Sequence, residues 1–143
     1  SVVSGVMTGG GLVDQPIGRH PKQRVKMAVV RDGKEAHTHY KVVKRFDGHT
    51  YIRLKLETGR THQIRVHMAS IKYPIVGDDT YGGRFRIHKG VSDQLRDSLQ
   101  YFGRQALHAR ALGLVHPASG EYVNWETELP EDMQNLLLAL EEG

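Results

Sequence analysis

One alternation of apolar and polar side chains constrains the fold of this 143-residue chain more than any other feature. It covers residues 50–56, where every second side chain is apolar, the period of a strand with one buried face. Residues 36–46 carry a second strand pattern and connect to the first through Asp47-Gly48-His49, a turn signal. Together the two segments predict a β-hairpin.

A dense polar cluster follows this strand directly. Between Arg60 and His67 the chain holds two arginines, two histidines and an amide. Such a cluster beside buried structure is costly unless it binds an anion or supports a reacting group. The spacing of Ile64, Met68 and Ile71 predicts that the cluster belongs to a helix over residues 61–71 with these three side chains buried. The cluster is therefore the candidate functional site.

The rest of the chain alternates short strand and helix patterns. Further strands are expected at residues 1–7, 12–17, 25–30, 106–116 and 121–125, the last two as a hairpin, with a basic loop at 18–24 and an irregular segment at 72–89. Helices are expected at residues 92–102, with Ser92 as N-cap, and from Pro130 onward, with Met133, Leu136, Leu137 and Leu140 on the apolar face. The pattern predicts one α+β domain with a mixed, largely antiparallel sheet and flanking helices.

Charge is distributed unevenly along the chain. All 20 Lys and Arg lie at or before Arg110, so residues 1–110 carry +11 and residues 111–143 carry −7, which together give +4. This favours a basic face for a polyanion, although solvated surface charge is the alternative and charge alone does not choose between RNA, DNA and a membrane surface. The chain has no cysteine and no apolar run of about 18 residues, so we expect a soluble, cytoplasmic protein.

Nine histidines raise the question of a metal site. His37 and His39 share one face of a predicted strand, and His62 and His67 lie close together in the polar cluster. The sequence has no His-Glu-x-x-His element, no cysteine and no third carboxylate at a fitting spacing. We therefore expect no metal site.

The run from Thr58 to His67, followed by Pro74-Ile75-Val76-Gly77-Asp78 and Tyr81-Gly82-Gly83, closely resembles the RluA-type pseudouridine synthases. The resemblance extends from about Val2 to Met133. It implies the pseudouridine synthase catalytic fold and the isomerisation of specific uridines to pseudouridine in 23S ribosomal RNA, without cofactor or metal. The implied partner is this RNA, free or in the precursor of the large ribosomal subunit, and the target uridine must leave its stack to be reached.

By this resemblance, Arg65 would pair with a nucleophilic aspartate and keep its carboxylate ionised and aimed. The alternative is a structural pairing of Arg65 with Glu57 or Asp78. The nucleophile of the family lies in an Arg-Leu-Asp-x-x-Thr-Ser-Gly element that these residues lack, and Asp47, at a predicted turn, resembles it only superficially. We therefore expect residues 1–143 to be the C-terminal portion of a catalytic domain, inactive alone. The alternative is a stand-alone basic RNA-binding module without catalysis.

The resemblance also suggests which other side chains contact RNA. Four residues of the polar cluster would line the phosphate and ribose near the target, or alternatively satisfy backbone groups at the start of the helix: Arg60, His62, Gln63 and His67. Leu107 would pack against the flipped base, or alternatively belong to the core. Two basic segments, residues 19–26 and 84–89, would position RNA through phosphate contacts made by Arg19, Lys22, Arg24, Arg84, Arg86 and Lys89.

Overall fold

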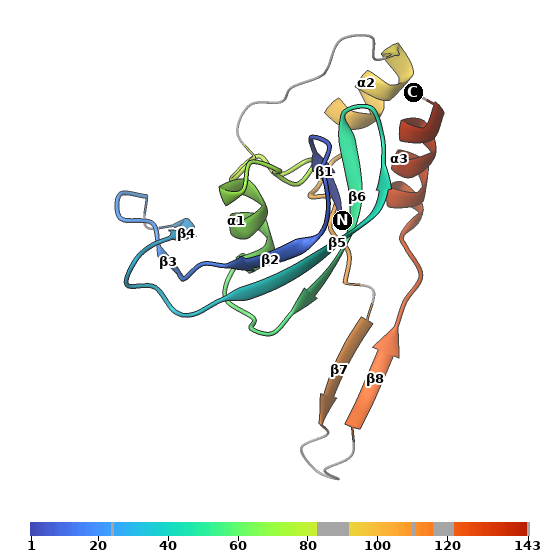
Figure 1. Ribbon diagram of the computed structural model, residues 1–143. Coiled ribbons are helices and arrows are strands. Elements are labelled where there is room, and N and C mark those ends of the chain that lie inside the picture. The colour runs from blue at the N-terminus through green and yellow to red at the C-terminus, as the bar shows by residue number, and fades with distance from the viewer. Residues whose placement is uncertain (24, 83–91, 110, 116–121, 143) are drawn as a thin grey trace.

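The computed structural model describes residues 1–23, 25–82, 92–109, 111–115 and 122–142 (Figure 1). Within these residues the chain forms short strands and three helices, and every strand pair is antiparallel. The predicted α+β class is therefore confirmed. The strands are β1 (Val2–Ser4), β2 (Gly11–Asp14), β3 (Ile17–Arg19), β4 (Met27–Val29), β5 (His37–Arg45), β6 (His49–Leu56), β7 (Ala111–Val115) and β8 (Tyr122–Glu126), and the helices are α1 (Gln63–Ser70), α2 (Asp93–Gln100) and α3 (Glu131–Glu142).

The main sheet has the order β1-β6-β5-β2 and is built around the predicted hairpin. The register of β5 and β6 runs from Thr38 opposite Leu56 to Arg45 opposite Thr50, with one irregularity between Val42 and Lys44. Strand β1 lies along the other side of β6 and is shorter than the strand predicted over residues 1–7. This sheet supports the polar cluster, because β6 leads through a short loop at residues 57–62 into α1.

The predicted strand at residues 12–17 divides into two. Strand β2 continues the main sheet, whereas β3 pairs with β4 in a separate hairpin, with Gly18 opposite Ala28. The prediction of a loop at residues 18–24 is therefore wrong for Gly18 and Arg19, since both lie within β3. The β3–β4 hairpin packs on α1 through a small apolar cluster whose members are Ile17, Ala36, Val66, Met27, Val29 and Tyr81.

Helix α1 turns the predicted face to the core but buries other side chains as well. Met68 is fully buried, but Ile64 and Ile71 are only partly buried against the core. The polar Gln63 and His67 are buried too. The prediction is confirmed for Met68 and incomplete for the rest of the helix, because apolar spacing alone does not show which polar side chains have hydrogen-bond partners in the interior.

Helices α2 and α3 lie together at the edge of the main sheet (Figure 1). Ser92 caps α2 as predicted, because its hydroxyl accepts a hydrogen bond from the backbone N–H of Leu95 at 3.1 Å. In α3 the predicted Met133, Leu136 and Leu140 are buried, but Ala139 joins them while Leu137 is only partly buried. Both helices contribute to the main core beside the sheet.

The irregular segment after α1 lies against the free edge of β1. The backbone N–H of Ser4 donates to Pro74 O at 2.8 Å, and the N–H of Val76 donates to Val2 O at 3.0 Å. The N–H of Ala106 then donates to Val76 O at 2.8 Å, which brings a third segment alongside. These bonds anchor the chain just before Asp78 and so place that residue beside α1.

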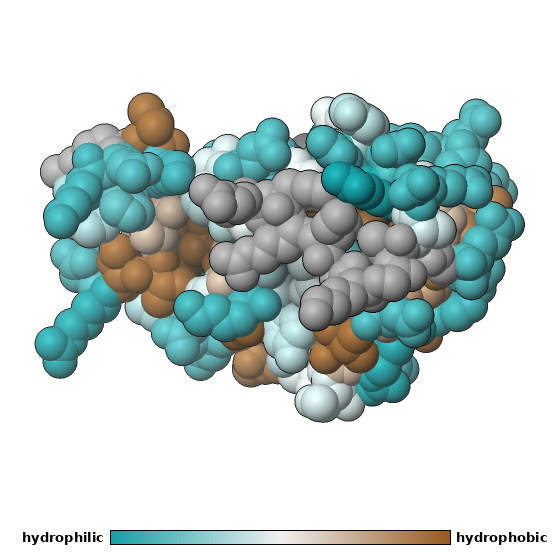
Figure 2. Space-filling view, turned by 90° about the horizontal axis from the view of Figure 1, so that it is seen from above, coloured by the Kyte–Doolittle hydropathy of each residue, from teal (hydrophilic) through white to brown (hydrophobic). Residues whose placement is uncertain are grey.

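The β7–β8 hairpin, confirmed by its antiparallel register, projects from the body and leads back into α3 (Figure 1). Viewed from above, the surface is mostly hydrophilic, and apolar groups are confined to separate patches (Figure 2). Within the part of the chain that is described, no helix is long and apolar enough to cross a membrane.

Candidate functional site

Gln63, the first residue of α1, organises the loop that precedes the helix. Its Oε1 accepts hydrogen bonds from Thr58 Oγ1 at 2.7 Å and from the backbone N–H of Arg60 at 3.0 Å. Its Nε2 donates to His37 O and to Thr38 Oγ1, both at 2.9 Å. Gln63 is only 3% exposed. This is the structural role that the sequence left open for Gln63, and it ties the loop and α1 to β5.

His67 continues the same buried network. Thr38 Oγ1 donates to Nδ1 of His67 at 2.7 Å, and Nε2 of His67 donates to Gln15 O at 2.8 Å. Because a carbonyl oxygen can only accept, Nε2 carries a proton, and the lowered pKa of the ring favours the neutral form in which Nδ1 accepts the Thr38 hydroxyl. Burial is the main cause that lowers the pKa of His67, and nearby His37 lowers it further, whereas the bond to Gln15 and the charge of Asp14 oppose the shift. His67 thus joins α1 to the connection between β2 and β3.

Arg65 forms a bidentate ion pair with Asp78. Its Nε lies 3.0 Å from Oδ2 and its Nη2 lies 3.0 Å from Oδ1. The side chain of Arg65 is 14% exposed and that of Asp78 only 1%. Asp78 Oδ1 also accepts the backbone N–H groups of Thr80 at 3.2 Å and Tyr81 at 3.1 Å. One of the two structural pairings left open by the sequence is therefore present.

The ionisation of this pair follows from its bonds. Burial raises the pKa of Asp78, but hydrogen bonds from Arg65 and from the backbone of Tyr81 and Thr80 outweigh it, so the pKa lies below its ordinary value. The same bond raises the pKa of Arg65. The other possible partner, Glu57, lies instead 2.8 Å from Nε2 of His39. Both Arg65 and Asp78 are thus ionised.

Two glycines allow the turn that carries Asp78. Gly77 has φ +82°, and a Cβ there would lie 1.9 Å from Arg104 O. A Cβ on Gly82 would lie 2.3 Å from Asp78 O, which accepts the N–H of Gly82 at 2.8 Å. The glycines of the Pro-Ile-Val-Gly-Asp and Tyr-Gly elements are therefore required by close backbone approach. Their effect is to hold Asp78 against Arg65.

Tyr81 joins Arg65 to the β3–β4 hairpin. The guanidinium carbon of Arg65 lies 4.9 Å from the centre of the Tyr81 ring. The Tyr81 hydroxyl accepts the backbone N–H of Met27 at 3.0 Å and lies 2.8 Å from Nδ1 of His62. His62 is exposed and has φ 54° at the start of α1. Sequence reasoning missed the role of Tyr81, although the Tyr-Gly element was its visible signal.

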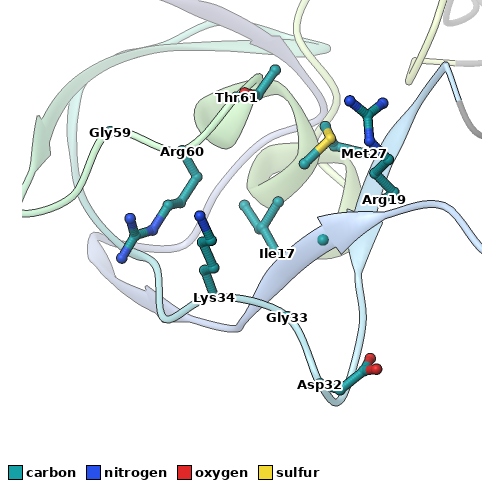
Figure 3. Close-up of a pocket in the computed structure, with 10 residues that line it drawn as sticks. Ile17, Arg19, Met27, Asp32, Gly33, Lys34, Gly59, Arg60 and Thr61 are labelled. Atoms are coloured by element: carbon teal, nitrogen blue, oxygen red, sulfur yellow. The ribbon is translucent and has the colours of Figure 1, made fainter.

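The predicted RNA-binding residues lie in different places. Arg19 and Arg60 line one groove of about 490 Å³ (Figure 3). Lys22 lies on an exposed turn in which the backbone N–H groups of Lys22 and Gln23 donate to Nδ1 of His20 at 3.1 and 3.0 Å. Leu107 is partly buried against the main core. Four further candidates lie outside the described residues: Arg24, Arg84, Arg86 and Lys89.

Asp47 and the polar cluster lie at opposite ends of β6. Asp47 is exposed at the turn between β5 and β6, whereas the segment that leads into α1 follows the other end of β6. Among the described residues, no three His, Asp or Glu side chains are grouped so that they could hold a metal ion. The structure therefore assembles an arginine, Arg65, in a fixed polar setting on α1, and a basic groove lined by Arg19 and Arg60 that reaches the loop before this helix.

Comparison with known proteins gives consistent matches. A sequence model described as RNA pseudouridylate synthase matches residues 3–70. The chain is 59% identical to ribosomal large subunit pseudouridine synthase D of Pseudomonas aeruginosa, over 98% of this chain and 44% of that protein. It is 54% identical to the protein of the same name from Escherichia coli, over 96% of this chain and 42% of that protein. The chain thus spans less than half the length of these curated relatives.

Among solved structures, the fold is similar to human RNA pseudouridylate synthase domain containing 4. The TM-score is 0.75 at 27% sequence identity, and the match covers 99% of this chain and 60% of that chain. The arrangement of sheet and helices described above is therefore shared with a protein of this kind.

Proposed function

Because the chain belongs to the pseudouridine synthase family, we propose that it is part of an enzyme that isomerises specific uridines to pseudouridine in 23S ribosomal RNA. The proposed partner is this RNA, free or within the precursor of the large subunit. The names of the similar bacterial proteins, which refer to the large ribosomal subunit, support this choice. The absence of cysteine suits the cytoplasm as the setting.

The geometry of Arg65 carries the proposal. Asp78 occupies its Nε and one side of Nη2, and the centre of the Tyr81 ring lies 4.9 Å from the guanidinium carbon. No hydrogen bond from Nη1 is found among the described residues. A guanidinium held in this way keeps a second pair of N–H groups, on Nη1 and Nη2, for another carboxylate. We assign that place to the nucleophilic aspartate, whose ionised form Arg65 would stabilise.

The nucleophile is proposed to come from outside these 143 residues. They contain no Arg-Leu-Asp-x-x-Thr-Ser-Gly element, and they span 44% of the Pseudomonas relative. On this basis residues 1–143 are the C-terminal portion of a catalytic domain. We assign Arg65 to catalysis, and Arg19, Lys22, Arg60 and His62 to RNA binding.

The buried members of the polar cluster act indirectly in this proposal. Gln63 and His67 have all their described polar contacts inside the protein, so their task is to hold Arg60 and α1 in place. The contact of Leu107 with a flipped base stays a prediction, as do the phosphate contacts of the basic residues outside the described ranges.

The decisive experiment changes Arg65 in the full-length protein. Arg65→Lys keeps the charge but loses the two-nitrogen geometry. We expect turnover on 23S RNA, measured as tritium release from labelled uridine, to fall about 100-fold or more, a size typical of losing a preorganised electrostatic contact. RNA affinity and the thermal midpoint are measured beside it, so that loss of the fold is recognised.

Arg104→Lys is the matched control, because Arg104 makes the same kind of pair with Asp132 in an exposed place. It should keep wild-type turnover. Near wild-type turnover in Arg65→Lys would overturn the assignment. The isolated 143-residue chain is expected to show no turnover, and a full-length protein that binds RNA without turnover would favour the binding module instead.

A further inference from the structure

A groove beside the polar cluster collects positive charge from three separate segments. It lies between the β3–β4 hairpin and the loop before α1, and Arg19, Lys34 and Arg60 line it. In Figure 3 the charged ends of Arg60 and Lys34 lie side by side at one end of the groove. Arg19 lies at the other end, and Asp32 lies at the tip of the turn, away from Arg60 and Lys34.

The two neighbouring cations lack a counter-ion within the described residues. Arg60 uses its Nε to donate to Glu35 O at 2.7 Å, and no hydrogen bond from its other two guanidinium nitrogens is found there. Lys34 is exposed, and its ammonium has no hydrogen bond or ion pair with any described residue. Like charges held side by side repel, and an anion between them would remove that cost.

The groove has a fixed position relative to Arg65. The backbone N–H of Arg60 donates to Gln63 Oε1 at 3.0 Å, and the N–H of Gln63 donates to Arg60 O at 3.1 Å. Gln63 opens the helix that carries Arg65 two residues later. An anion bound by Arg60 would therefore lie at a set distance from the proposed catalytic arginine.

The groove offers two positions for an anion, one at Lys34 and Arg60 and one at Arg19. A polymer that carries an anion in every repeat suits these two positions better than a single small anion does. We propose that the groove is a phosphodiester site, in which Lys34 and Arg60 bind a backbone phosphate of the RNA strand near the target nucleotide. Arg19, at the far end, is placed for a neighbouring phosphate. The inference rests on the proposed function for its choice of RNA, and it assigns a role to Lys34, which no sequence motif marked.

The first test measures RNA binding by the full-length protein at several salt concentrations. Lys34→Ala should lower the slope of log affinity against log salt by about one, and Lys34→Ala with Arg60→Ala by about two. The double variant should bind about tenfold more weakly at 0.1 M salt. The single Lys34 variant removes no described contact, so it keeps the test valid even if loss of Arg60 disturbs the loop.

The matched control is Lys41→Ala with Lys55→Ala, which removes two exposed lysines of β5 and β6 outside the groove. It should leave the slope nearly unchanged. An equal loss of slope in the control would show a general effect of charge and overturn the site, as would an unchanged slope in the groove variants.

The second test replaces single phosphates of the RNA by uncharged methylphosphonates. We expect one or two positions near the target uridine where this weakens binding by the wild type but not by the double variant. If no such position exists, the phosphodiester site is overturned. Turnover is followed in parallel: groove-dependent binding without turnover contradicts only the proposed function, whereas normal turnover with unchanged binding in the double variant contradicts only the groove.

Discussion

Two arginines of this protein each bind an aspartate with the same geometry but in different surroundings. Arg65 approaches Asp78 with Nε and Nη2 at 3.0 Å each, and Arg104 approaches Asp132 with the same atoms at 2.9 and 3.0 Å. The side chains of the first pair are 14% and 1% exposed, and those of the second are 40% and 47% exposed. The geometry of the arginine–aspartate contact is shared, whereas the burial of the two pairs differs.

This difference decides what each pair does. Removing one member of a buried pair leaves a charge without water or partner, whereas water replaces the lost partner at the surface. Asp78 also accepts the backbone N–H groups of Thr80 and Tyr81, so it organises a turn as well as an arginine. Arg104 connects α3 to the segment before β7 and has no such enclosed partner. The buried pair is therefore the one suited to hold a reacting group in place.

The largest effect is expected from Asp78→Ala. It leaves Arg65 without its partner and removes the acceptor of two backbone N–H groups, so the free energy of unfolding should fall by about 3–5 kcal/mol. Urea denaturation measures this loss. A decrease no larger than that of an exposed pair would contradict the importance of burial.

Burial shifts the pKa of His67 in the opposite direction from that of Asp78. It raises the pKa of a carboxyl group and lowers the pKa of an imidazole, which here has no ion-pair partner among the described residues. The pKa of His67 is lowered in the folded state, so its neutral form stabilises the fold above the unfolded value near 6.5. Stability should therefore decrease as pH falls below 6.5, until the folded pKa is passed. His37, whose pKa is raised mainly by its hydrogen bond to Glu35, contributes stability below 6.5 and partly offsets this trend.

His67→Leu isolates that contribution. It removes the bonds to Thr38 and Gln15 and should cost about 1–3 kcal/mol at pH 8. The difference in unfolding free energy between wild type and variant should then shrink as pH is lowered from 7 toward 5. A difference that stays constant with pH would show that His67 does not titrate with folding.

Tyr81→Phe tests how firmly the buried pair is joined to the β3–β4 hairpin. The ring beside Arg65 remains, but the hydroxyl bonds to Met27 and His62 are lost, so we expect a loss of about 0.5–1.5 kcal/mol. Hydrogen exchange of the Met27 amide should accelerate more than that of amides in β6. Equal protection of the Met27 amide in variant and wild type would contradict the connection.

The smallest effect is expected from Asp132→Ala, which breaks the exposed pair. The unfolding midpoint should shift only slightly, and the shift should decrease further at high salt because exposed charges are screened. Denaturation at low and high salt checks both points. A shift as large as that of Asp78→Ala would remove the contrast between the two pairs.

Local patterns were sufficient for the longest hairpin and for the start of α2, but not for the division between β2 and β3. The alternation in residues 50–56 and the Asp47-Gly48-His49 turn predicted the β5–β6 hairpin, and Ser92 predicted the start of α2. These features depend on neighbours in the chain, so the sequence reveals them. The family resemblance likewise followed from the ordered motifs between Thr58 and Gly82.

The sequence by itself determined the strand and helix periods, the charge asymmetry and the presence of a polar cluster, because each is a property of residues close together in the chain. Only the tertiary structure decided that Gln63 and His67 are buried, that Asp78 rather than Glu57 holds Arg65, and that Lys34 and Arg60 meet in one groove. Each of these depends on which distant segments the sheet and α1 bring together, and hydrogen-bond partners and burial, not residue type, then determine what a polar side chain can do.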